Sequence, residues 1–93
     1  MNQAEEWYKK ALKISIDDLW AINPVRLAIS LNYALLLHDF KDQQNDAIFL
    51  SETMIEAAFS FLDDMRGEDI KNLDESIQLL TEMRSNLEMW YKK

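Results

Sequence analysis

The chain has 93 residues, with 10 lysine and arginine residues, 17 aspartate and glutamate residues and no cysteine. This length suffices for one small domain that hides about 60 to 65% of the unfolded chain's surface. The formal net charge of -7 argues against a nucleic-acid ligand, because such affinity depends on clustered basic residues. The lack of cysteine excludes disulfides and thiolate chemistry.

The composition also favours helices over strands. One glycine and one proline leave little material for β-hairpin turns, whereas good helix formers are abundant. We expect an all-α protein, with residues 1–93 forming a single segment of four helices, antiparallel because their links are short. The apolar run at 27–37 is too short to span a bilayer, so we expect a soluble cytoplasmic protein without membrane contact.

The first helix is expected over about residues 3–19. Tyr8, Leu12 and Leu19 repeat at the spacing of a half-buried helix, and most charged side chains fall on the opposite face. An apolar connector at 20–22 leads to the next helix.

Local chemistry sets the start of the second helix, expected over about 24–40. Asn23 can cap it through its side-chain oxygen, and Pro24 suits the first helical position. The helix has few polar groups, so we expect it to be central and buried on most sides. Asn32 lies among apolar helical neighbours, where an unpaired amide costs about 1 to 3 kcal/mol, so we expect a partner for it.

The third helix is expected over about 45–64, with Asp42 or Asn45 as its cap. Gly67 is the expected stop, because glycine takes left-handed angles beyond a helix end without a side-chain clash. The charged connection at 65–71 is the expected mobile loop.

The fourth helix is expected over about 73–91. Asn72 and Glu75 resemble a capping box at its start. One edge of this helix mixes apolar and amide side chains where a solvated face would carry charges, and this predicts a contact surface. The edge consists of Gln78, Leu79, Glu82, Asn86 and Met89 or Trp90.

Catalytic chemistry has little support in this sequence. His38 is the only histidine and is read as a structural or solvated residue. In the acidic segment 62–69, side chains that carry no oxygen ligand stand where a calcium loop requires oxygen ligands. We therefore interpret this segment as a solvated linker. Glu52 and Glu56 lack the Glu-x-x-His pattern of a dimetal site. We expect no catalytic residue, metal site or cofactor, and therefore no enzyme.

Two amides remain, Asn32 on the second helix and Asn86 on the fourth. A primary amide carries donors and an acceptor, so two of them can clamp the main chain of an extended peptide. The alternative is an internal hydrogen bond within the core.

Four short segments, distributed over most of the chain, have a specific spacing in combination. They are YKKALKIS at 8–15, NPVRL at 23–27, LNY at 31–33 and RSNLEMW at 84–90. In combination they resemble the C-terminal part of the 14-3-3 family. The resemblance implies four helices that correspond to the last four of the family's nine, within a dimeric adaptor that binds phosphoserine or phosphothreonine peptides.

The resemblance implies that Asn32 and Asn86 hold the peptide main chain. The family's phosphate pocket and dimer surface belong to earlier helices, so this segment would supply the clamp and an apolar groove wall without useful phosphopeptide affinity by itself. The implied partners are phosphorylated proteins, and the full-length protein is expected to be a homodimer. The other implied groove residues are Leu31, Leu35, Asp39, Leu79 and Trp90.

The sequence departs from the family at Gln78 and Glu82, where the family usually places apolar groove residues. Two readings of Glu82 stay open. Its carboxylate lies in the groove and favours peptides with Arg or Lys beside the phosphorylated residue, or it points to solvent.

Two rival functions also stay open. One is a scaffold of the tetratricopeptide-repeat (TPR-like) kind that binds unphosphorylated partners. The segment 8–12 favours it, and so does Ala47, which follows Ala11 at nearly the distance of one repeat. An oligomerisation bundle is the other, with Trp7, Trp20 and Trp90 buried against another subunit.

Overall fold

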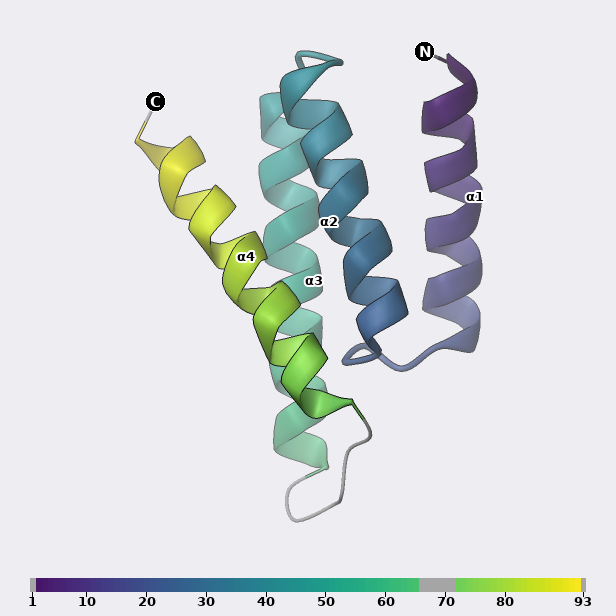
Figure 1. Ribbon diagram of the computed structural model, residues 1–93, viewed down its shortest axis with the longest axis vertical. Coiled ribbons are helices and arrows are strands. Elements are labelled where there is room, and N and C mark those ends of the chain that lie inside the picture. The colour runs from purple at the N-terminus through teal and green to yellow at the C-terminus, as the bar shows by residue number, and fades with distance from the viewer. Residues whose placement is uncertain (1, 66–71, 93) are drawn as a thin grey trace.

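The computed structural model describes residues 2–65 and 72–92 and consists of four helices connected by short links (Figure 1). Neither range contains a β-strand, so the all-α prediction is confirmed. The helix bounds differ from those expected from the sequence by at most one residue. The helices are α1 (Asn2–Asp18), α2 (Pro24–Asp39), α3 (Gln44–Asp64) and α4 (Leu73–Tyr91).

The central helix of the array is α2, as predicted. It packs against the other three helices, whereas α1 contacts only α2 among the described helices. Successive helices run in opposite directions, with α1 at one side of the molecule and α4 crossing α3 at the other (Figure 1). The array measures 41 × 30 × 17 Å along its principal axes, so much of its surface lies on two broad faces.

The start of α2 has the predicted chemistry. Asn23 has extended angles, and its side-chain oxygen accepts a 2.8 Å hydrogen bond from the Val25 amide. Pro24 takes the first helical position, where its missing amide proton leaves no bond unmade.

The capping box predicted at the start of α4 does not form. Asn72 has left-handed angles, with φ of 61° and ψ of 29°, and its side chain makes no capping hydrogen bond. Asparagine tolerates this conformation better than most residues. Its main-chain carbonyl accepts a hydrogen bond from the Ser76 amide, so the backbone begins the helix without the side chain.

The cap predicted for α3 is also wrong. Gln43 takes the capping position without a side-chain bond, and neither Asp42 nor Asn45 caps the helix. The Asp42 carboxylate instead accepts a 2.7 Å hydrogen bond from the Gln44 side-chain amide. At its other end α3 stops at Asp64, as predicted. The predictions for Gly67 and for the connection at 65–71 concern positions outside the described residues, apart from Met65.

The core has two adjoining parts that follow α2. The first joins the beginning of α2 to the middle of α3 and α4, and the second joins its end to the beginning of α3 and the end of α4. Half-buried side chains such as Leu12 and Leu35 pack against both parts. The first part contains Ile22, Leu27, Leu31, Met54, Ala58, Leu80 and Met83. The second contains Tyr33, Ala34, Leu37, Ala47, Leu87 and Trp90.

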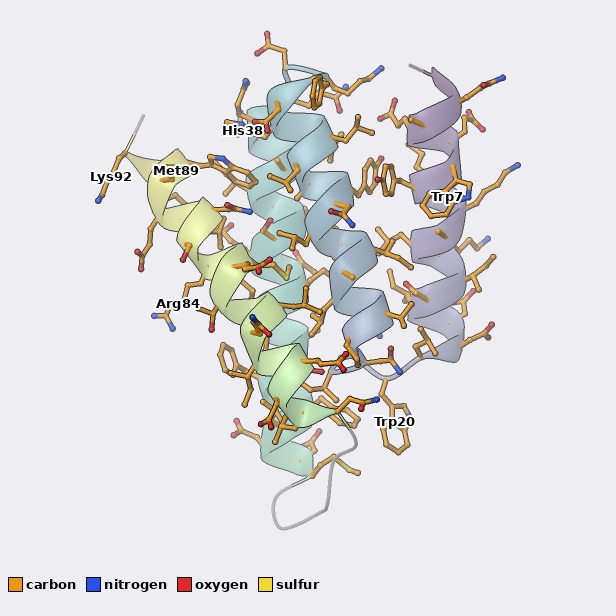
Figure 2. All side chains as sticks on the ribbon, viewed as in Figure 1. Trp7, Trp20, His38, Arg84, Met89 and Lys92 are labelled. Atoms are coloured by element: carbon orange, nitrogen blue, oxygen red, sulfur yellow. The ribbon has the colours of Figure 1, made fainter. Side chains whose placement is uncertain are left out.

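Two of the three tryptophans extend outward (Figure 2). Trp7 is 61% exposed and Trp20 is 64% exposed, whereas Trp90 is 6% exposed and packs within its own chain. Trp90 therefore does not fit the contact between subunits that the oligomerisation alternative assigned to it. No helix in the described part of the chain combines the length and apolarity that crossing a bilayer requires.

Candidate functional site

One flank of α2 is left uncovered by the three helices around it. Asn32 and Asp39 are exposed on this flank, seven residues and thus about two helical turns apart. Leu35 lies between them and is half-buried. Leu31 is 8% exposed and joins the first part of the core. The flank therefore has polar groups at its surface and leucine side chains at its base.

The buried stripe of α4 separates two flanks of that helix. Arg84 and Tyr91 lie on the flank that faces α3, where they line a groove between the two helices. Helical periodicity puts Leu79, Glu82 and Asn86 on the opposite flank. Leu79 and Asn86 are half-buried there, and Glu82 is exposed.

Neither candidate clamp residue is locked inside the protein. Asn32 is exposed, so water can satisfy its amide and the expected internal partner is unnecessary. Within the residues described, neither the Asn32 side chain nor the Asn86 side chain forms a hydrogen bond, and neither has a buried polar atom without a partner. Both amides thus keep their donors and acceptor available to a ligand.

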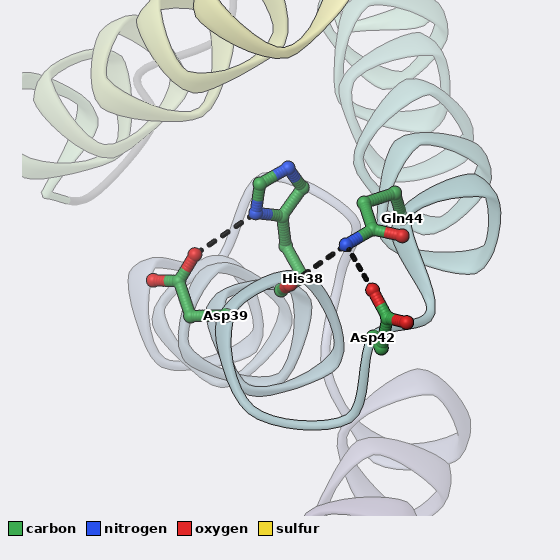
Figure 3. Close-up of polar contacts among 4 residues, drawn as sticks. All are labelled: His38, Asp39, Asp42 and Gln44. Atoms are coloured by element: carbon green, nitrogen blue, oxygen red, sulfur yellow. Dashed lines mark hydrogen bonds and ion pairs between the residues drawn. The ribbon is translucent and has the colours of Figure 1, made fainter. Parts of the chain in front are cut away.

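His38 and Trp90 connect the ends of α2 and α4. Their rings stack with centroids 4.3 Å apart and planes inclined by 10°. Nδ1 of His38 lies 2.9 Å from the Asp39 carboxylate, a distance at which the ring nitrogen donates a hydrogen bond (Figure 3). The Gln44 side-chain amide donates to the His38 carbonyl at 3.4 Å and also to Asp42. Since Trp90 is buried, little of its side chain can reach a ligand beside α2 and α4.

The acidic side chains do not form a metal centre in the described part of the chain, because no three potential ligands gather there. The Glu52 carboxylate instead accepts a hydrogen bond from the Tyr91 hydroxyl, and this bond raises the pKa of Tyr91. Burial lowers the pKa of Arg26, whose guanidinium donates a 3.1 Å hydrogen bond to the Leu19 carbonyl. This arginine therefore braces the connector between α1 and α2.

Three helices pack around the central α2, and the two candidate clamp residues lie on adjoining helices, with Asn32 exposed on α2 and Asn86 half-buried on α4. The model of the family described as "14-3-3 protein" matches residues 1–91 of this chain. The chain belongs to the 14-3-3 family. The resemblance seen in the sequence is thereby confirmed, and so is the helical fold that it implied.

Individual 14-3-3 relatives cover nearly all of this chain. It is 31% identical over 87 residues to 14-3-3 protein homolog 2 of Echinococcus multilocularis. That match covers 94% of this chain and 34% of the Echinococcus protein. It is 30% identical over 89 residues to the checkpoint signal transducer rad24 of Schizosaccharomyces pombe. That match covers 96% of this chain and 32% of rad24. The chain thus spans about a third of the length of the curated relatives it matches.

Sequence reasoning missed one surface of this 14-3-3 chain, the groove between α3 and α4. Its only signal in the sequence was the pair Glu52 and Glu56, one helical turn apart on α3. The remaining groove residues come from α4, and periodicity within one helix does not show which other helix lies beside it.

Proposed function

We propose that this chain forms one wall of the peptide groove in a phosphoserine- or phosphothreonine-binding adaptor, with Asn32 and Asn86 as the main-chain clamp. The family match over residues 1–91 is the observation that carries this proposal. Each carboxamide can accept a hydrogen bond from a main-chain amide of an extended peptide and donate one to a main-chain carbonyl, whichever side chains the peptide carries. Leu31, Leu35 and Leu79 would form the apolar wall.

The positions of the two amides support the proposal. Asn32 lies on the uncovered flank of α2, and Asn86 lies on the flank of α4 that is turned away from α3. The two helices pack directly on each other, and the stacking of His38 on Trp90 holds their ends together. A clamp needs such a rigid base, because positional freedom of the amides would weaken both bonds.

Phosphate recognition would come from elsewhere in the assembled adaptor. Strong phosphate binding uses paired, charge-assisted bonds to arginine, whereas a neutral amide bond contributes about 1 kcal/mol net. The flanks with the two amides carry Asp39 and Glu82, whose negative charge repels phosphate. We therefore expect the isolated chain to bind phosphopeptides too weakly to detect at micromolar concentrations.

A chimera can test the proposal. Residues 1–93 would replace the matching third of 14-3-3 protein homolog 2 of Echinococcus multilocularis, and fluorescence anisotropy would compare a phosphoserine peptide with its unphosphorylated twin. We expect the chimera to bind only the phosphorylated peptide. Asn32→Ala and Asn86→Ala should each weaken binding about fivefold, as expected for a lost bond of about 1 kcal/mol.

Asn45→Ala provides the matched control, because Asn45 is an exposed asparagine on α3 and lies outside both flanks. It should leave affinity unchanged. Equal binding of both peptides by the chimera would contradict phosphate dependence and favour a scaffold for unphosphorylated partners. Equal effects of the Asn45 and Asn86 substitutions would contradict the clamp.

A further inference from the structure

The groove between α3 and α4 lies on the opposite flank of α4 from Asn86. Its volume is about 730 Å³, within the range of about 300 to 1,000 Å³ typical of ligand sites. Arg84, at its edge, extends from α4 away from α1 and α2 (Figure 2). The groove is thus separate from the candidate phosphopeptide site.

The floor of the groove is apolar. Leu87 is 6% exposed, Ile55 is half-buried, and Phe59 is 47% exposed. An adjoining hollow of about 290 Å³ shares Ile55 and Phe59 and continues along α4 to Ile77, which is 48% exposed. A continuous open strip of large apolar side chains is characteristic of an interaction surface.

The rim of the groove is acidic. Glu52 and Glu56 come from α3 and Glu88 comes from α4, whereas Arg84 is the one cation among the lining residues. Within the two described ranges, no ion pair engages any of these four side chains. The lining therefore carries a net charge of -2, and the chain as a whole carries -7. This charge favours a basic partner and repels an acidic one.

A hydrogen bond between side chains links the α3 and α4 walls of the groove. The Tyr91 hydroxyl of α4 donates to the Glu52 carboxylate of α3 at one end of the groove. At the base, Leu87 and Ile55 belong to the packed core and its border. A groove that is formed before binding loses less conformational entropy when a ligand enters.

We propose that the α3–α4 groove docks a basic amphipathic helix of a partner protein. Apolar side chains spaced one helical turn apart would lie on Phe59 and Leu87, and flanking lysine or arginine side chains would reach Glu56 and Glu88. A groove between two helices suits the apolar stripe of a third helix. The contact needs no phosphate, since its recognition groups are apolar or acidic.

The probe for this site is a labelled synthetic peptide of about four helical turns, with leucine on one face and lysine on the others. A twin peptide with glutamate in place of every lysine has the same helical pattern and opposite charge. We expect the 93-residue chain to bind the lysine peptide and not the glutamate peptide in an anisotropy titration. Binding of both peptides would overturn the proposal, because charge would then have no part in selection.

Substitutions locate the binding surface. The double variant Glu56→Gln, Glu88→Gln should weaken binding of the lysine peptide about tenfold, as two rim carboxylates are removed. The matched control is Asp63→Asn, Asp74→Asn, which removes one exposed acid from each of the same helices outside the groove. A control that weakens binding as much as the groove variant would show general charge attraction and overturn the proposal.

Two further measurements separate this site from the clamp. Phe59→Ala should weaken binding, and peptide addition should shift the methyl NMR signals of Ile55 and Leu87. Asn32→Ala should leave the affinity for the lysine peptide unchanged. Unshifted methyl signals, or a loss of affinity in Asn32→Ala as large as in Phe59→Ala, would place the peptide elsewhere and overturn the proposal.

Discussion

The imidazole of His38 stacks on the indole of Trp90 across the junction of α2 and α4, with ring centroids 4.3 Å apart. His38 is 7% exposed and Trp90 is 6% exposed, so the pair is part of the core. Both residues lie close in sequence to candidate site residues, Asp39 on α2 and Asn86 on α4. The stack therefore stabilises the relative position of the two flanks on which the proposed clamp depends.

Replacing His38 with alanine should loosen this junction. In a Trp7→Phe, Trp20→Phe background, Trp90 is the only tryptophan. We expect His38→Ala to shift its emission to longer wavelength and to lower the free energy of unfolding by about 2 kcal/mol, because packing and an aromatic contact are lost. Phe40→Ala, at a neighbouring residue that is 70% exposed, should change neither quantity. Unchanged emission in His38→Ala would show that the stack does not bury Trp90.

A buried hydroxyl connects α4 to the chain before α2. The Ser76 hydroxyl is fully buried and donates a 2.5 Å hydrogen bond to the Ile22 carbonyl. Ser76→Ala leaves this carbonyl without its partner, so we expect the free energy of unfolding to fall by about 1 to 3 kcal/mol in urea titrations. Ser85→Ala, at an exposed position on the same helix, should change it by less than about 0.5 kcal/mol. Similar stability of the two variants would contradict the role of the Ser76 bond.

Much of the fold follows from local chemistry in the sequence. Asn23 and Pro24 specify the start of α2 without information from other helices, and the observed bond to Val25 has the predicted form. Asn72 shows the limit of this reasoning. An asparagine before a helix can cap it with its side chain or take left-handed angles, and the residue pattern does not distinguish the two.

The candidate site was harder to predict from the sequence, because the exposure of a side chain depends on which helices pack together. Asn32 has apolar helical neighbours, yet it is exposed since three surrounding helices leave one flank of α2 uncovered. Trp90, which the resemblance implies at the end of the groove, is buried and stacks on His38, and only the tertiary structure shows this contact. In the α3–α4 groove, Glu88 joins Glu56 from a different helix, and only the tertiary structure brings them together.

Tyr33 should make stability depend on alkaline pH. Burial raises the pKa of Tyr33 above its ordinary value of 10.0, and the charges of Glu5 and Asp46 raise it further. The folded state thus favours the neutral phenol, and this stabilisation is complete below pH of about 10 and is lost as the pH rises toward the folded-state pKa. We expect the free energy of unfolding to fall above pH of about 10, and to fall less steeply in Tyr33→Phe.

Substitution of Glu5 tests the cause of the Tyr33 shift. Glu5→Gln should lower the pKa of Tyr33, followed by tyrosinate absorbance with Tyr33→Phe as the reference for assignment. Glu6→Gln removes the same charge from a neighbouring exposed position and should have little effect. Equal shifts in the two variants would mean that overall charge, and not Glu5, acts on the phenol.

Glu82 is the last candidate for ligand selectivity. It is exposed on the same flank of α4 as Asn86, one helical turn before it. If its carboxylate borders the bound peptide, the chimera should prefer a phosphopeptide with arginine beside phosphoserine over the alanine equivalent by about threefold, the size expected for one exposed ion pair. Salt should reduce this preference, because exposed charges are screened.

Paired substitutions distinguish this role of Glu82 from general attraction by an acidic protein. Glu82→Leu should abolish the arginine preference and restore the apolar character that the family usually has at this position. Asp63→Leu makes the same chemical change at an exposed site on α3 and should retain the preference. An arginine preference that survives in Glu82→Leu would mean that this carboxylate points to solvent, because removing a contact with the peptide must change the ratio of the two affinities.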